Sequence, residues 1–248
     1  MIYIKTPQEI QNIRRAGQIS KAIMQKAIET AVIGANLLDI EVLISSELEA
    51  NGATGWFKEK KDYPFVSCLS VNEIWIHGMP HDYKLKQGDI LSIDLGVKYN
   101  KYYTDHCWTI GIGTDLSAEK QRFLAKGEEA LINAVSNFKL NNRLGDISHG
   151  MQKVIEEAGF SVIKDFIGHG VGIKPHEDPI IPCYGRADTG LLLRPGMVFA
   201  IEIMYSMGAP DIKILDDGWS VRSADNSLTG MFEHTVALTE KGPEILTI

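Results

Sequence analysis

The chain has 248 residues, of which 44% are hydrophobic and 23% are charged, so it is long and apolar enough to bury a sizeable core. Its 25 basic and 32 acidic residues give a net charge of -7, which offers no basic excess to nucleic acid or an anionic membrane. Three widely spaced cysteines fit neither a disulfide framework nor a CxxC zinc site, and the most apolar run, 197–204, is interrupted by Glu202; we therefore expect a cytoplasmic protein without a membrane span.

Two helices are predicted at the start of the chain. Thr6 is the expected cap of the first, with Pro7 in its first turn and Glu9 as the partner in a capping box. Apolar residues recur behind it at helical spacing, namely Ile10, Ile13, Ala16, Ile19 and Ile23. The second helix carries its apolar residues over 37–48 and is expected to end at Asn51-Gly52, because glycine readily adopts the left-handed conformation that terminates helices.

The order of helix, helix and strands then starts again. Ser117 can cap a long helix, and a further helix ending at Gly159 carries Ile147, Met151, Val154, Ile155 and Ala158. We therefore predict an α+β fold with two pseudo-symmetric halves, roughly 1–115 and 116–248, whose strands meet in a shared sheet. No linker rich in Pro, Gly or Ser separates the halves, so we expect one domain over 1–248.

Two aspartates are predicted to share one face of a hairpin. Residues 91–97 alternate in polarity like a strand, which places Asp94 on the face opposite the apolar residues. The turn is expected at Tyr99-Asn100-Lys101, with Asp105 on the return strand and the neighbouring His106 turned to the other side. A separation of eleven residues makes the two carboxylates direct or diagonal neighbours for any turn with an even number of residues. Such like charges repel, so the pair calls for a cation or a shared proton.

Two further acids interrupt apolar strands in the second half of the chain. Glu202 lies in the run 197–204, and Glu233 alternates with apolar residues over 232–238. A carboxylate buried alone is costly, so each needs a partner. His169 lies among glycines that allow close backbone approach. Four carboxylates balance the charge of two divalent cations, and oxygen ligands with one imidazole suit manganese, iron, cobalt or zinc.

Each of these residues, taken singly, also fits a structural role. Asp94 and Asp105 could be turn or edge residues, and His169 an ordinary loop residue. Other motifs are missing: the glycines of 168–172 lack the third glycine of GxGxxG, His176-Glu177 lacks the second histidine of HExxH, and neither GxSxG nor GxxxxGK[ST] occurs. Only the set of five residues is specific.

The ordered pattern D-x10-D, GHGxG followed by HExP, an IE strand and EHT resembles the type I methionine aminopeptidases, which are metallopeptidases with the pita-bread (creatinase/aminopeptidase) fold. The resemblance covers nearly the whole chain and implies a curved antiparallel sheet shared by the two halves. It further implies that Asp94 chelates one of two divalent ions, that His169 and Glu202 hold the other, and that Asp105 and Glu233 bridge them.

The implied activity is removal of the N-terminal methionine from nascent proteins or peptides with a small second residue, by metal-activated hydroxide attack on the first peptide bond. By the resemblance, Glu202 would take the proton of the water and pass it to the leaving amine. His176 would hydrogen-bond the developing oxyanion, and His77 would contact the scissile amide.

An apolar methionine pocket is also implied, and the matching positions are Tyr63, Cys68 and Trp219. Three positions depart from the usual pattern. Lys60 falls where the pocket often has a tyrosine, Pro175 precedes His176 where an aromatic is common, and Ile203 replaces the proline common after the strand glutamate. We therefore expect an intact metal site beside an atypical pocket.

Two alternatives share this pattern. Xaa-Pro aminopeptidases and prolidases resemble it in their metal ligands but usually carry a long N-terminal domain, and Asp94 lies too near the start for one. Pita-bread relatives that have lost catalysis and bind protein or nucleic acid typically lose ligands, whereas all five are present here. The expected partners are methionyl peptides and nascent chains near the ribosome, with no nucleic acid or membrane contact, and the expected state is a monomer.

Overall fold

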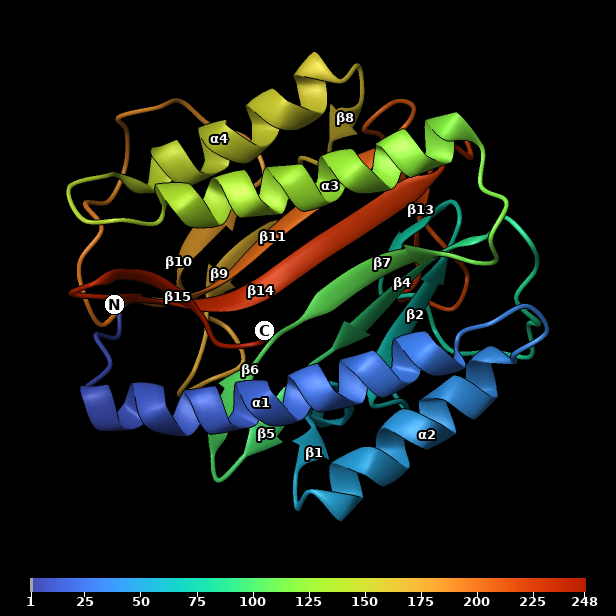
Figure 1. Ribbon diagram of the computed structural model, residues 1–248, viewed down its shortest axis with the longest axis horizontal. Helices are drawn as coiled ribbons and strands as arrows, with labels where there is room; N and C mark the ends of the chain where they lie inside the picture. Colours follow the sequence, from blue (N-terminus) through green and yellow to red (C-terminus); the bar gives the residue numbers. More distant parts are fainter. Residues whose placement is uncertain (1) are drawn as a thin grey trace.

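The protein is described by a computed structural model that covers residues 2–248. Two helix pairs lie over one side of a long sheet, one pair over each half (Figure 1). The first pair is α1 (Pro7–Thr30) with α2 (Leu37–Ala50), and the second is α3 (Ala118–Asn137) with α4 (Leu144–Glu157). None of the helices within 2–248 combines the length and the apolar character needed to cross a bilayer.

Within the described residues, the largest sheet has nine antiparallel strands. Seven of these strands follow one another across the sheet in this order: β10 (Glu177–Pro182), β9 (Ile167–Gly170), β11 (Val198–Ser206), β14 (Thr229–Thr239), β7 (Cys107–Gly111), β4 (Ile90–Leu95) and β2 (Ser67–Val71). In addition, β15 (Gly242–Ile245) pairs with β14, and β8 (Ser161–Val162) pairs with β11. Strands of the two halves meet where β14 pairs with β7, so the halves share one sheet.

Two small sheets flank this one. The first joins β1 (Thr54–Gly55), β5 (Val97–Tyr99) and β6 (Tyr102–Thr104), and the short 3₁₀ helix η1 (Trp56–Glu59) follows β1 directly. The second joins β12 (Ile212–Ile214), β13 (Val221–Ser223) and β3 (Ile74–Ile76).

The helix boundaries follow local signals in the sequence. The predicted capping box is confirmed, since the Glu9 N–H donates to Thr6 Oγ1 and the Thr6 N–H donates to Glu9 Oε2. Ser117 caps α3, as expected. Gly52 and Gly159 both have positive φ angles, 63° and 79°, just beyond the ends of α2 and α4. The apolar faces that these helices present to the sheet are buried.

The expected hairpin with its turn at Tyr99-Asn100-Lys101 is interrupted. Its turn forms between β5 and β6, but these strands belong to a small sheet, and Asp105 lies between β6 and β7 rather than in a continuous return strand. The cause is Thr235 on β14, whose Oγ1 accepts from the Asp105 N–H and donates to the Asp105 carbonyl, both at 2.8 Å. Asp94 pairs with Cys107, so Asp105 is its diagonal neighbour, one of the two predicted arrangements.

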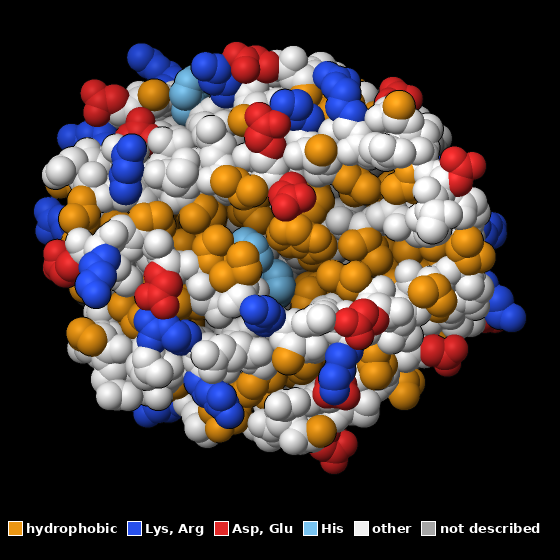
Figure 2. Space-filling view, in the orientation of Figure 1, with side chains coloured by type: hydrophobic (Ala, Val, Ile, Leu, Met, Phe, Trp, Pro, Cys, Tyr) orange, Lys and Arg blue, Asp and Glu red, His pale blue; other side chains and the backbone are white. Residues whose placement is uncertain are grey.

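The two faces of the sheet have different roles. Phe199, Ile201 and Ile203 of β11 belong to the apolar core formed with α3 and α4, so the alternating Glu202 projects from the opposite face. His106 also points to the helix side, where its Nδ1 lies 3.3 Å from Ser20 Oγ of α1. Figure 2 shows this helix-bearing side: charged side chains cover both helix pairs, and an apolar strip runs between them.

Candidate metal centre and active site

All the predicted metal, catalytic and substrate-binding residues line one cavity of about 370 Å³, whereas the atypical Pro175 and Ile203 do not. The predicted residues come from both halves of the chain and are Tyr63, Cys68, His77, Asp94, Asp105, His169, His176, Glu202, Trp219 and Glu233. Strands of the main sheet form its floor, and connecting segments form its rim. The cavity therefore combines a polar floor with largely apolar walls.

Strand register brings the carboxylates together on the floor. Glu202 and Glu233 are directly opposite each other in the β11–β14 ladder. Ligand atoms of Asp105, His169 and Glu233 lie within 4.8 Å of one another, and His169 Nε2 is 3.7 Å from Asp105 Oδ2. Asp94 enters the same cavity from β4. Directly opposed like charges destabilise a sheet, so this arrangement needs a compensating charge.

The electrostatics of the floor point to the same need. Burial raises the pKa of Asp94 to about 7 and that of Glu202 to about 8. Burial, followed by repulsion from the neighbouring carboxylates, raises the pKa of Asp105 and Glu233 well above the usual range. Three carboxylate oxygens, one each from Asp94, Asp105 and Glu233, have no hydrogen-bond partner within residues 2–248. Unpartnered oxygens next to an imidazole are a donor set that fits divalent cations.

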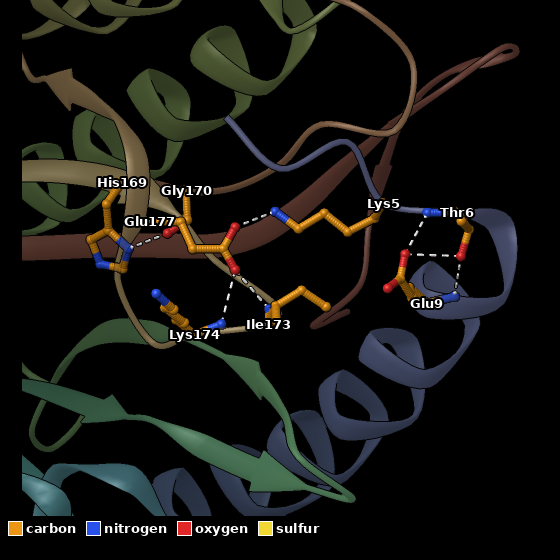
Figure 3. Close-up of polar contacts among 8 residues, drawn as sticks. All are labelled: Lys5, Thr6, Glu9, His169, Gly170, Ile173, Lys174 and Glu177. Carbon is orange, nitrogen blue, oxygen red and sulfur yellow. Dashed lines mark hydrogen bonds and ion pairs between the residues drawn. The ribbon is translucent and has the colours of Figure 1, made fainter. Parts of the chain in front are cut away.

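His169 is oriented toward the carboxylates by its own backbone neighbour. Its Nδ1 lies 3.0 Å from the Gly170 carbonyl oxygen (Figure 3). A carbonyl only accepts, so Nδ1 carries the proton and the Nε2 lone pair faces the acidic floor. Burial lowers the pKa of His169 to about 4, which keeps the ring neutral. A neutral imidazole fixed in this way is the usual form of a metal ligand.

A buried ion pair holds the segment between His169 and His176. Figure 3 shows Glu177 accepting from the Ile173 and Lys174 N–H groups through one oxygen and from Lys5 Nζ through the other, at 2.7, 2.9 and 2.6 Å. The Lys5 and Glu177 side chains are only 2% and 0% exposed, and burial lowers the pKa of Lys5. The start of the chain thus fastens the segment that carries His176. The sequence interpretation missed this pair, because nothing local links residues so far apart.

Two further histidines stand on the rim. The His77 ring packs edge-on against Phe166 and Trp219, with centroid distances of 5.7 and 6.2 Å. The His176 ring lies 4.4 Å from the ring of His169. Burial lowers the pKa of His77 to about 4 and that of His176 to about 3, so both rings are neutral at physiological pH. Neutral imidazoles can donate one hydrogen bond each to a ligand in the cavity.

Comparisons with known proteins agree with this geometry. Residues 11–240 match the model of metallopeptidase family M24. The chain belongs to this family. It is 41% identical over 248 residues to the methionine aminopeptidase of Clostridium perfringens, covering 100% of this chain and 99% of that protein. It is 39% identical over 247 residues to methionine aminopeptidase 1 of Bacillus subtilis, again with 100% and 99% coverage.

Solved structures of two peptidases superpose on nearly the whole chain. The methionine aminopeptidase of Thermotoga maritima matches with a TM-score of 0.97 and 39% identity, covering 100% of this chain and 99% of that one. The prolidase of Pyrococcus furiosus matches with a TM-score of 0.76 and 26% identity, and only 65% of its chain is covered. The predicted pita-bread fold and the resemblance to type I methionine aminopeptidases are confirmed, and membership of this metallopeptidase family implies divalent metal binding.

The walls of this M24 cavity are mostly apolar. The Tyr63 hydroxyl donates to the Ser67 carbonyl at 2.8 Å, its oxygen lies 3.1 Å from Cys68 Sγ, and its ring packs against Trp219. Burial raises the pKa of the Cys68 thiol, so it stays neutral. Sequence reasoning had not assigned several wall residues to the site: Trp56, Phe57, Ile76, Phe166, Met204 and Met231. Strand alternation could have found two of them, since Met204 and Met231 lie two residues from Glu202 and Glu233.

Proposed function

We propose that the protein removes the N-terminal methionine from peptides and nascent chains whose second residue is small, using two divalent metal ions. The observation that carries the proposal is the convergence of four buried carboxylates and one neutral imidazole on the floor of an otherwise apolar cavity. The names of the M24 relatives, methionine aminopeptidases over the full length of the chain, support the same activity.

The proposed ligand set divides the five floor residues unequally. Asp94 would chelate one ion, His169 and Glu202 would hold the other, and Asp105 and Glu233 would serve as ligands shared by both. The short separation of the ligand atoms of Asp105, His169 and Glu233 supports this division. When bound, cobalt, manganese, iron or zinc acidifies water and polarises a carbonyl oxygen, which is the chemistry that peptide hydrolysis needs.

Glu202 is the proposed proton carrier. Its side chain lines the cavity beside the other floor residues, so an ionised Glu202 carboxylate can accept a proton from water there and return it to the leaving amine. His176 donates a hydrogen bond to the oxyanion that develops from the scissile carbonyl, and His77 contacts the scissile amide. The lowered pKa values of both histidines support these donor roles, because each ring is neutral and keeps one N–H.

The apolar wall is the proposed site of the methionine side chain. Tyr63, Cys68 and Trp219 offer aromatic surface and a polarizable sulfur, which suit a thioether. The cavity volume of about 370 Å³ lies within the range of sites that enclose small ligands. We further propose that the protein acts as a monomer in the cytoplasm, on nascent chains near the ribosome.

A peptide panel tests this function. Met-Ala-Ser, Leu-Ala-Ser and Ala-Pro-Ala are offered to the metal-free protein after addition of manganese, cobalt, iron or zinc, and the bound metal is counted per chain. We expect about two ions per chain, as the charge of four carboxylates requires, and selective release of methionine from Met-Ala-Ser. Selective cleavage of Ala-Pro-Ala would overturn the methionine assignment, and no cleavage with any metal would overturn the enzymatic one.

A further inference from the structure

Lys60 occupies a specific place beside the rim histidine. It follows η1 directly, and its N–H donates to the Phe57 carbonyl at 2.9 Å, which anchors its backbone. Its Nζ lies 3.3 Å from Nδ1 of His176, a residue 116 positions further along the chain. Although the lysine side chain is largely exposed, it lines the cavity. A cationic donor therefore touches one of the proposed donors to substrate.

The indole ring of Trp56 contacts both Lys60 and His176. Its indole Nε1 donates to the Thr104 carbonyl at 3.1 Å, and the ring is almost fully buried, so its position is rigid. Lys60 Nζ lies 5.6 Å from the centroid of the indole, within the range of a cation–π contact. The His176 ring meets the same indole edge-on, with the centroids 5.2 Å apart. The indole is thus a fixed platform that restrains both the ammonium group and the imidazole.

The chemistry of the two groups decides the position of the imidazole proton. An ammonium group has three donors and no acceptor, so Nδ1 of His176 must accept. A neutral imidazole with an accepting Nδ1 carries its hydrogen on Nε2. We propose that Lys60 is a positioning residue that holds His176 in the Nε2–H tautomer and so keeps an N–H donor available to the reacting carbonyl. This proposal rests on the proposed role of His176 as the oxyanion donor.

The opposite tautomer would work against the reaction. With the hydrogen on Nδ1, the nitrogen left for the cavity would be Nε2 with its lone pair, and a lone pair repels the negative charge that develops on the carbonyl oxygen. The contact with Lys60 excludes this state, because the ammonium group would then face an N–H group. Lys60 therefore acts through His176 and makes no bond to substrate itself.

Three substitutions test the inference through steady-state kinetics on Met-Ala-Ser. Lys60→Met keeps an unbranched side chain that is one atom shorter and removes the donor, whereas Lys60→Arg keeps a donor. Lys61→Met is the matched control, because it removes the same charge from the next position, which does not line the cavity. We expect Lys60→Met to lower kcat about tenfold with KM changed less than about twofold, a fraction of the loss seen when an oxyanion donor is deleted. Lys60→Arg should restore most of kcat, and Lys61→Met should resemble the wild type.

A loss carried by KM alone would overturn the inference, because it would show that Lys60 binds the peptide, for example through a carboxylate. Equal kcat values for the wild type and Lys60→Met would overturn it as well. Thermal melting checks the fold of each variant, and we expect no change, since the side chain is exposed.

The tautomer can also be read without any activity. In the zinc-loaded protein, which is diamagnetic, the ¹⁵N chemical shifts of the imidazole nitrogens distinguish Nε2–H from Nδ1–H, and the His176→Gln variant identifies the signals of His176. We expect Nε2–H in the wild type and a mixture of tautomers in Lys60→Met. A protonated Nδ1 in the neutral wild-type ring would overturn the inference. If no peptide were cleaved at all, the proposed function would fail, while these spectra would still decide the role of Lys60.

Discussion

The floor and the rim of the cavity are built in different ways. On the floor, Glu202 and Glu233 face each other in a ladder of long, buried strands, and a slip of one residue in either strand would turn its glutamate to the other face of the sheet. On the rim, His176 depends on side-chain contacts with Lys60 and on the ion pair of its neighbour Glu177 with Lys5. The comparison teaches that backbone register positions the proposed ligands, whereas a few long-range contacts position the proposed donors.

Among the substitutions considered, the largest loss of activity is expected for a residue on the floor of the cavity. Glu202→Gln keeps the shape of the side chain but cannot carry a proton, so we expect kcat to fall by about a thousandfold, within the range of general acid–base catalysis. The fold should be retained, because the substitution removes a buried charge. Kinetics on Met-Ala-Ser and thermal melting measure the two effects, with the exposed Glu49→Gln as control. Wild-type rates in Glu202→Gln would show that the proton carrier lies elsewhere.

The next effect tests how strongly the rim depends on the start of the chain. Lys5→Met leaves Glu177 buried without its cation, which typically costs about 3 kcal/mol of the free energy of unfolding. Urea unfolding measures the loss. The control is Lys26→Met, which breaks the exposed ion pair with Glu47 and should cost less than about 1 kcal/mol.

A double variant sharpens this test. Adding Glu177→Gln to Lys5→Met removes the uncompensated charge, so part of the lost stability should return. If Lys5→Met were no more harmful than Lys26→Met, the claim that this pair fastens the rim would be wrong.

A smaller effect is expected on how the stability of the metal-free protein depends on pH, because its floor carboxylates lack a compensating cation. The pKa of Glu202 is raised to about 8 in the folded chain, against about 4 in an unfolded one. Such a group favours the fold fully below its unfolded pKa, and this contribution is lost as the pH rises through the folded pKa. The buried rim histidines have lowered pKa values, so they stay neutral above about pH 7.5 and do not obscure the trend.

Most of the Glu202 contribution is lost below about pH 7.5, so we expect the metal-free protein to lose a further amount of about 1 kcal/mol or less of the free energy of unfolding between about pH 7.5 and about pH 9. Saturating manganese should largely suppress the loss, because a bound cation favours the ionised carboxylates. Metal-free Glu202→Gln, with one titrating group fewer, should show a shallower decline. Stability that is constant with pH in the metal-free wild type would contradict the proposed charge balance.

The smallest effect should come from the apolar wall. Trp219→Phe keeps an aromatic ring but reduces the surface beside Tyr63 and His77. We expect KM for Met-Ala-Ser to rise about threefold to tenfold, as for a weakened aromatic contact, with kcat nearly unchanged. Tyr184→Phe, at an exposed position outside the cavity, serves as control. A large loss of kcat would place Trp219 with the groups that orient the reacting bond.

Local patterns were sufficient for most of the fold. The capping box at Thr6 and Glu9 and the glycines that end α2 and α4 predicted helix boundaries, because these interactions join residues a few positions apart. Alternation placed Glu202 and Glu233 on one face of each strand, because the period of two is a property of the extended backbone.

These local patterns could not predict contacts between residues that are far apart in the sequence. The interruption of the hairpin at Asp105 depends on Thr235, and the rim depends on the pairs Lys5–Glu177 and Lys60–His176. Each joins residues more than a hundred positions apart, and no periodicity carries information over such a separation.

The sequence by itself thus determined which side chains are candidates for chemistry, since a carboxylate in an apolar strand is costly wherever the strand packs. Only the tertiary structure decided which of them meet, because the pairing of β14 with β7 brings the acids of the two halves into one cavity. It also decided that a lysine stands next to His176, since that contact depends on how η1 packs against the segment after β9.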